Sequence, residues 1–189
     1  MPFRLVTWNC REGVDRKRGQ FDRLAADVLV VPECGQYPLF ARELGVSFAW
    51  RGTGRKGLGV FGRNGWQVVP AVERNPLPWV LPLHVVDPAG DAVALLLAVG
   101  TVPTEGVRTY AGQIAMAISE WEQEIRDGAT ILAGDFNCSA QTADARQHHV
   151  NVDRLHAFGA VSAYHGHAGL GPSTCKFSRS VSTARTKCN

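Results

Sequence analysis

The segment TILAGDFNCS, residues 130–139, combines an apolar run with polar side chains. Its first half is apolar and strand-like, and Asp135 and Asn137 then follow one position apart. A short apolar run that ends in polar residues is typical of a buried strand, and loops at strand ends are where scaffolds carry chemistry. A carboxylate and a carboxamide at this position therefore indicate a candidate site.

Two earlier strand-like segments end in the same way. FRLVTWN, residues 3–9, ends on Asn9, and DVLVVPE, residues 27–33, ends on Glu33. A carboxylate at the rim of a core needs a partner. A hard cation such as Mg²⁺ takes oxygen ligands, typically one or two carboxylates with waters and a substrate phosphate. Glu33 with the side-chain oxygen of Asn9 fits that requirement.

Together, the four residues indicate metal-assisted hydrolysis of a phosphate ester. Asp135 would orient or deprotonate an attacking water, and Asn137 would donate its amide N–H to a phosphate oxygen as charge builds there. Each position taken alone also has a structural interpretation, because Asn and Asp after a strand are common turn residues. The combination of the four in chain order favours the functional interpretation.

The rest of the chain predicts many strands with interspersed helices in one domain. We expect helices over 15–26, 36–45, 105–127 and about 150–158, and further strands over 46–51, 57–62, 66–73, 79–86, 92–100 and 160–164. The consecutive strands in the middle favour mixed or antiparallel sheets. Two packed sheets flanked by helices would fit this order of elements.

Composition sets few further limits. The chain is 45% hydrophobic and 20% charged, which is ordinary for a soluble globular protein. It has no run of 18 apolar residues, so we expect no membrane span, and its first residues lack the features of a signal peptide. Five cysteines at irregular spacing do not indicate a disulfide framework, so we expect reduced thiols and a cytoplasmic location.

The net charge of +3 comes from the last residues. Residues 175–189 contain four basic side chains and no acid, whereas the rest has 16 basic and 17 acidic residues, a net charge of −1. Charge alone therefore gives no argument for a nucleic-acid partner. A basic run fits either a solvated helix face or a phosphate-binding rim, and comprises Arg11, Arg16, Lys17, Arg18 and Arg23. Lys56 would face either the site or water.

Histidines and cysteines leave further alternatives open. A zinc site or ordinary surface and half-buried positions would fit the histidines of the last fifth, His148, His149, His156, His165 and His167. Core packing or a thiolate role would fit the cysteines that each follow a candidate site residue, Cys10, Cys34 and Cys138. Spacing favours the structural interpretation of the histidines, and strand alternation favours core packing for the cysteines.

Four motifs, LVTWNCREG, DVLVVPEC, KGLGVF and ILAGDFNCS, resemble in order and spacing those of the endonuclease/exonuclease/phosphatase superfamily. The resemblance covers roughly residues 3–165. It implies a DNase I-like α/β fold, a four-layer sandwich of two mixed β-sheets flanked by helices. It also implies a hydrolase of phosphodiester or phosphomonoester bonds that depends on Mg²⁺ or Mn²⁺. The implied substrate is a nucleic acid or a small phosphorylated molecule, and no protein partner is implied.

By the same resemblance, Asn9 and Glu33 correspond to the metal site. Asp135 corresponds to the residue that positions or activates water, and Asn137 to the residue that contacts the phosphate. The chain also departs from the family pattern. Pro32 stands where many relatives have Gln.

Two other departures affect the candidate site. Thr101 and Thr104 follow the strand at 92–100, where a His, Tyr or Asn is usual. The terminal Asp-containing strand and Ser-Asp-His string are missing. We therefore expect a partial domain over 1–174, incomplete at its C-terminus, and a disordered, basic, Ser/Thr-rich tail over 175–189. The alternative function is a truncated, catalytically impaired family member with at most weak metal or phosphate binding.

Overall fold

A computed structural model describes residues 2–102, 109–139, 141, 143–163 and 184–185. The strands are β1 (Arg4–Thr7), β2 (Val28–Cys34), β3 (Ser47–Thr53), β4 (Lys56–Gly62), β5 (Gln67–Pro70), β6 (Val80–Val86), β7 (Ala92–Gly100), β8 (Thr130–Asp135) and β9 (Ala184–Arg185). The helices are the 3₁₀ helix η1 (Asp15–Lys17), α1 (Arg18–Arg23), α2 (Pro38–Leu44), α3 (Tyr110–Glu120), α4 (Glu122–Arg126) and α5 (Ala145–Ala157).

The strands form two mixed sheets. One has the order β3-β4-β2-β1-β9 and the other the order β5-β6-β7-β8. Each sheet contains one parallel pair, β1 with β2 and β7 with β8, and the other pairings are antiparallel. The expectation of mixed sheets is confirmed.

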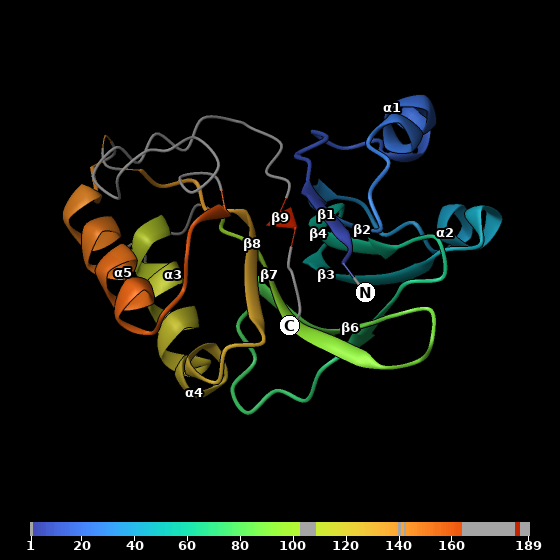
Figure 1. The fold of residues 1–189 in the computed structure, drawn as a ribbon. Helices are drawn as coiled ribbons and strands as arrows, with labels where there is room; N and C mark the ends of the chain where they lie inside the picture. Colours follow the sequence, from blue (N-terminus) through green and yellow to red (C-terminus); the bar gives the residue numbers. More distant parts are fainter. Residues whose placement is uncertain (1, 103–108, 140, 142, 164–183, 186–189) are drawn as a thin grey trace.

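Two layers of helices enclose the sheets, as Figure 1 shows. Apolar residues of β1 and β2 such as Val6 and Leu29 pack on their outer side with Phe21 of α1 and Phe40 of α2. On the outer side of the second sheet, Leu97 of β7 packs with residues of α3, α4 and α5. The predicted four-layer α/β sandwich is confirmed.

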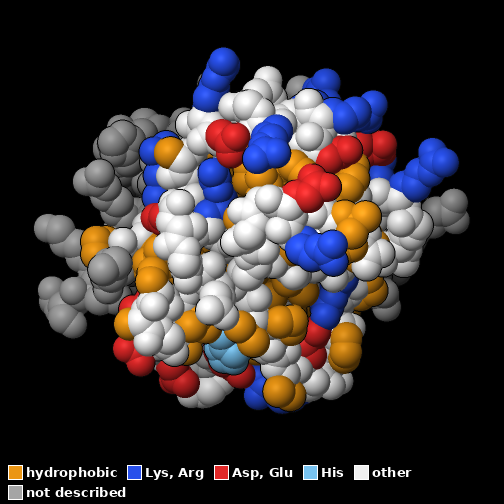
Figure 2. All heavy atoms as spheres, turned by 90° about the vertical axis from the view of Figure 1, so that its right-hand side faces the viewer, with side chains coloured by type: hydrophobic (Ala, Val, Ile, Leu, Met, Phe, Trp, Pro, Cys, Tyr) orange, Lys and Arg blue, Asp and Glu red, His pale blue; other side chains and the backbone are white. Residues whose placement is uncertain are grey.

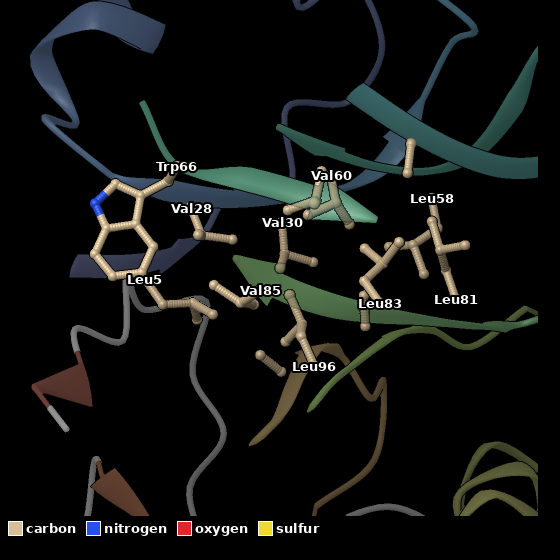
Figure 3. Packing of buried hydrophobic residues seen from close by; sticks show 14 of the residues in the cluster. Leu5, Val28, Val30, Leu58, Val60, Trp66, Leu81, Leu83, Val85 and Leu96 are labelled. Carbon is tan, nitrogen blue, oxygen red and sulfur yellow. The ribbon is translucent and has the colours of Figure 1, made fainter. Parts of the chain in front are cut away.

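The central core lies between the two sheets (Figure 3). Val28 and Val30 alternate along β2 with residues that face the outer helices, because successive side chains of a strand point to opposite faces. Leu83 of β6 and Leu96 of β7 meet them from the opposite sheet. β2 is therefore buried on both faces up to Pro32, which explains its apolar sequence before Glu33.

Helix boundaries differ from the sequence-based expectation at several points. The segment 15–26 forms η1 and the short α1, and Ala25 in the left-handed region (φ 47°) follows. The long helix expected over 105–127 is divided at Trp121 into α3 and α4, and residues 103–108 lie outside the described part. α5 begins at Ala145 rather than near residue 150.

The strand expected over 160–164 is wrong for the described residues 160–163, which contain no strand. Gly159 (φ 83°) follows the end of α5, and Val161 is 89% exposed. An alternating apolar pattern forms a strand only where a neighbouring element covers its apolar face. Val161 has no such cover, because most of its surface is exposed.

Two further expectations concern membrane spans and the C-terminal segment. None of the helices in the described part of the chain combines the length and the apolar character needed to cross a lipid bilayer. Of the expected tail over 175–189, only Ala184 and Arg185 are described, and they pair with Leu5 and Arg4 of β1. The rest of that segment lies outside the described residues, so the domain boundary stays a prediction.

Candidate active site

The candidate site forms where the two parallel strand pairs end. Neighbouring parallel strands end at the same edge of a sheet, so Asn9, just after β1, and Glu33, near the end of β2, lie side by side. Thr101 and Asp135 are placed in the same way by β7 and β8, whose register pairs Gly100 with Asp135. The two edges belong to different sheets, and the packing of β8 against β1 and β2 brings them together.

One amide joins the two edges. Nδ2 of Asn9 donates to Oε1 of Glu33 at 2.9 Å and to Oδ2 of Asp135 at 3.0 Å. Oδ1 of Asn9 accepts from the backbone N–H of Arg11 at 3.0 Å, which fixes the direction of the amide. The structure therefore brings together three of the four residues predicted from the sequence through direct hydrogen bonds.

A bulge directs Glu33 into the site. The register between β2 and β4 shifts between Pro32 and Cys34, so Glu33 is the extra residue and adopts φ 54°. A non-glycine residue in this region is uncommon and costs about 1–3 kcal/mol unless its surroundings hold it. Bulges of this kind re-aim a side chain next to a functional site.

A glycine places Asp135. Gly134 has φ 149°, and a Cβ added there would lie 1.8 Å from the carbonyl oxygen of its strand partner Val99. Only glycine allows this close approach of β8 to β7. The backbone of Asp135 then accepts hydrogen bonds from the backbone N–H and the hydroxyl of Thr101, each at 3.1 Å.

Asn137, the fourth predicted residue, lies beside Asp135 with its amide turned toward Thr101. Its backbone N–H donates to Oδ1 of Asp135 at 3.2 Å. Its Nδ2 donates to the carbonyl and hydroxyl oxygens of Thr101 at 3.2 and 3.3 Å. Asn137 adopts φ 49°, a conformation that asparagine tolerates better than most residues. Asn137 therefore joins the site through Asp135 and not through Asn9.

Thr101 is a site residue that sequence reasoning undervalued. It is buried, and it holds both the backbone of Asp135 and the side chain of Asn137. Its position directly after β7 can be read from the sequence, but the parallel pairing of β7 with β8, which brings it to Asp135, cannot. Thr104, the other threonine considered, lies outside the described residues.

Lys56 faces the site rather than water alone. Its Nζ lies 3.0 Å from Oε1 of Glu12 and 3.5 Å from Oε2 of Glu33. The hydrogen bond from Asn9 lowers the pKa of Glu33, with Lys56 and Arg11 adding to the effect against a smaller opposing effect of burial. The hydrogen bond to Glu12 raises the pKa of Lys56. Glu33 is therefore held as a carboxylate.

The basic run after Asn9 has mixed roles. Nζ of Lys17 donates to the carbonyl oxygens of Cys10 and Glu12, so this side chain braces the loop. Arg11, Arg16 and the other members of the run are exposed. Figure 2, which views the side of α1 and α2, shows Lys and Arg interspersed with Asp and Glu. Within the described residues this face is of mixed charge, which supports a solvated surface better than a continuous phosphate-binding rim.

The three cysteines next to site residues, Cys10, Cys34 and Cys138, are buried. Burial raises the pKa of Cys10 and of Cys34, which suits core packing better than a thiolate role. Sγ of Cys138 lies 3.5 Å from Nδ1 of the buried His148, which links the loop of Asn137 to α5. His165 and His167 lie outside the described residues.

The donor set fits a hard divalent cation. No three His, Cys, Asp or Glu side chains come together as a metal-binding group in the described part of the chain. Glu33 and Asp135 nevertheless lie on either side of one Asn9 amide group, and Mg²⁺ typically takes one or two carboxylates and completes its shell with waters. Oxygen donors of this kind suit Mg²⁺ or Mn²⁺ rather than zinc.

The chain has a fold similar to that of several solved structures, one of which is described as an endonuclease/exonuclease/phosphatase family protein. A superfamily protein from Bacteroides thetaiotaomicron matches with a TM-score of 0.57 and 16% identity, over 84% of this chain and 68% of that one. An AP endonuclease from Archaeoglobus fulgidus matches with a TM-score of 0.60 and 12% identity, over 87% and 74%. D. rerio TDP2 complexed with a single-strand DNA product matches with a TM-score of 0.53 and 16% identity, over 86% and 66%.

These similarities are confined to structure. No protein-family model matches the sequence, and no curated protein matches it. The chain spans 66–74% of the length of the three solved structures. At identities of 12–16% the comparison shows the fold alone. The predicted resemblance is confirmed for the fold.

Proposed function

We propose that this chain is a divalent-metal-dependent hydrolase of phosphate ester bonds. The observation that carries the proposal is the Asn9 amide, which holds one carboxylate from each sheet, Glu33 at 2.9 Å and Asp135 at 3.0 Å. A pair of carboxylates held at the rim of a sandwich, half-exposed to solvent, serves no packing purpose. The fold of the solved relatives supports the same reaction class.

Each side chain has a role that its contacts permit. Glu33 would hold the Mg²⁺ or Mn²⁺ ion. The side-chain oxygen of Asn9 would join it once the amide gives up its hydrogen bond from the backbone N–H of Arg11 and turns its oxygen toward Glu33. The ion would neutralise charge on the phosphoryl oxygens. Both carboxylate oxygens of Asp135 accept one hydrogen bond and retain lone pairs, so Asp135 is held in place and still able to orient or deprotonate a water.

Asn137 would contact the phosphate with its amide. An amide NH₂ group carries two hydrogens, so one remains with Thr101 while the other donates to a phosphoryl oxygen. Thr101 would thereby position Asn137 without touching the substrate. The relatives of known activity, an AP endonuclease and a TDP2 with a DNA product, favour a nucleic-acid phosphodiester as the substrate to test first.

A second candidate function is binding of metal or phosphate with little turnover. Within the described residues, the hydrogen-bonded site contains no histidine, and Thr101 stands where the family usually has a His, Tyr or Asn. Groups that act as a unit lose most of their effect when one is removed. This observation favours a slow enzyme or a binding protein, and turnover decides between the two candidates.

The test is hydrolysis of single-stranded DNA, of duplex DNA with an abasic site and of a generic phosphodiester, with Mg²⁺, with Mn²⁺ and with EDTA. We expect metal-dependent turnover that falls by about 100-fold or more in Glu33→Gln and Asp135→Asn. Glu43→Gln is the matched control, since Glu43 lies exposed on α2. Metal binding without turnover would support the second candidate, and turnover that both site variants retain would refute the proposal.

A further inference from the structure

Lys56 places a positive charge at the carboxylate where the proposed metal would bind. Its ammonium lies 3.5 Å from Glu33 and 3.0 Å from Glu12, so it lies between two carboxylates. The side chains of Lys56, Glu33 and Glu12 are 57%, 43% and 42% exposed, respectively, so a solvated ion can reach the group. The proposed reaction assigns no role to the Lys56 ammonium.

The fold, and not a chance rotamer, brings Lys56 to this position. The hairpin between β3 and β4 pairs Thr53 with Lys56, and the register of β4 on β2 pairs Gly57 with Cys34, the residue after Glu33. A Cβ on Gly57 would lie 2.3 Å from the carbonyl oxygen of Arg51, so glycine is required for this close approach. The backbone of Lys56 therefore lies directly beside the bulge that carries Glu33.

Charge balance around the amide of Asn9 depends on Lys56. Asn9 is neutral and donates to both Glu33 and Asp135, which are acidic. Of the two carboxylates, Glu33 has an ion-pair partner among the described residues, and that partner is Lys56. A divalent cation bound to Glu33 would lie next to this ammonium, and the two positive charges would repel each other.

We propose that the Lys56 ammonium is a built-in counter-ion of Glu33 that a divalent cation must displace, so that Lys56 sets the metal affinity of the site. The inference rests on the proposed function, because it takes Glu33 as a metal ligand. Glu12 makes the displacement feasible. The ammonium already has its shorter contact with Glu12 and keeps that partner when it leaves Glu33.

The test compares Mn²⁺ affinities of the intact chain, measured by calorimetry or by water proton relaxation without any substrate. In Lys56→Met the competing cation is absent, and we expect Mn²⁺ to bind about three- to tenfold more tightly, the range for loss of a partly screened charge beside a divalent ion. Arg55→Met is the matched control. Arg55 is the preceding residue, carries the same charge and takes part in none of the ion pairs found in the described part of the chain.

Three results separate the inference from the function on which it rests. Tighter binding in Lys56→Met, with Arg55→Met within about twofold of the unmodified protein, supports the inference. Binding that is unchanged or weaker in Lys56→Met, while Glu33→Gln loses affinity, overturns the inference and leaves the proposed function standing. Equal Mn²⁺ affinity in Glu33→Gln and the unmodified protein overturns both. Far-ultraviolet circular dichroism and thermal unfolding of each variant confirm that affinities are compared between folded proteins.

Discussion

Replacing Gly134 with alanine tests the geometry that delivers Asp135 to the site. The added Cβ would lie 1.8 Å from the carbonyl oxygen of Val99, about 1.6 Å short of ordinary van der Waals contact. The neighbouring atoms are backbone, and Val99 and Gly134 are paired in the sheet, so neither can move away without opening the ladder. The φ of 149° adds a conformational cost, since side chains rarely adopt it.

The expected loss of stability follows from these two costs. Backbone strain contributes about 1–3 kcal/mol, and overpacking in a closely packed region contributes about 1–3 kcal/mol. Because strands relax in part, we expect Gly134→Ala to lower the free energy of unfolding by about 2–4 kcal/mol. With a urea m-value of about 2 kcal/mol/M for a domain of this size, the midpoint should fall by about 1–2 M.

Gly19→Ala is the matched control for this substitution. Gly19 lies in α1, and a Cβ there meets nothing within 4 Å. Alanine should therefore leave the free energy of unfolding unchanged or raise it by about 0.5–1 kcal/mol, because it favours the helix and restricts the unfolded chain. Urea unfolding followed by tryptophan fluorescence and by circular dichroism gives both values. A midpoint for Gly134→Ala within about 0.3 M of the unmodified protein would show that β7 and β8 do not approach as described.

Two further predictions concern charged groups. Asn9→Ala should raise the pKa of Glu33, because the Asn9 hydrogen bond is the main cause of its lowering. A carboxyl pKa that is lower in the folded state stabilises that state at pH values above the unfolded pKa, and this stabilisation is lost as pH falls through the folded pKa of Glu33. The carboxyl carbon shift of Glu33 in an NMR titration measures the pKa directly, and an unchanged value in Asn9→Ala would contradict the assignment. Glu73→Ala should lower the free energy of unfolding by about 1–2 kcal/mol, because it leaves the largely buried guanidinium of Arg51 with backbone carbonyl partners only. Glu43→Ala, at an exposed position of α2, is the control in the same urea experiment, and equal midpoints for the two variants would refute the prediction.

The parts of the fold that could be predicted are those set by local sequence. The apolar run of β2 before Glu33 and the polar residues at the ends of three strands are local patterns. They predicted buried strands and a common site for Asn9, Glu33 and Asp135, which the structure joins by hydrogen bonds. The strand expected over 160–164 failed for the same reason. Its alternation is local, whereas strand formation needs a neighbour, and Val161 is exposed.

The parts of the site that could not be predicted depend on register between distant strands. Thr101 supports Asp135 and Asn137 because β7 pairs in parallel with β8, which lies about thirty residues further along the chain. A threonine after a strand carries no signal of that pairing by itself. The direction of Lys56 was open for the same reason, since it depends on the pairing of β4 with β2 across the bulge at Glu33.

The site belongs to neither sheet alone, and this determines how it responds to change. Asn9 and Glu33 belong to one sheet and Asp135 to the other, so the 3.0 Å hydrogen bond from Asn9 to Asp135 exists only while the two sheets keep their spacing. That spacing is set by the core between them, in which Val30 and Leu96 face one another from opposite sheets. Interiors are close-packed and transmit small displacements, so a volume change in this core moves the two carboxylates relative to each other. A substitution far from the site would then reduce binding of the proposed metal without replacing any of the residues proposed to hold it.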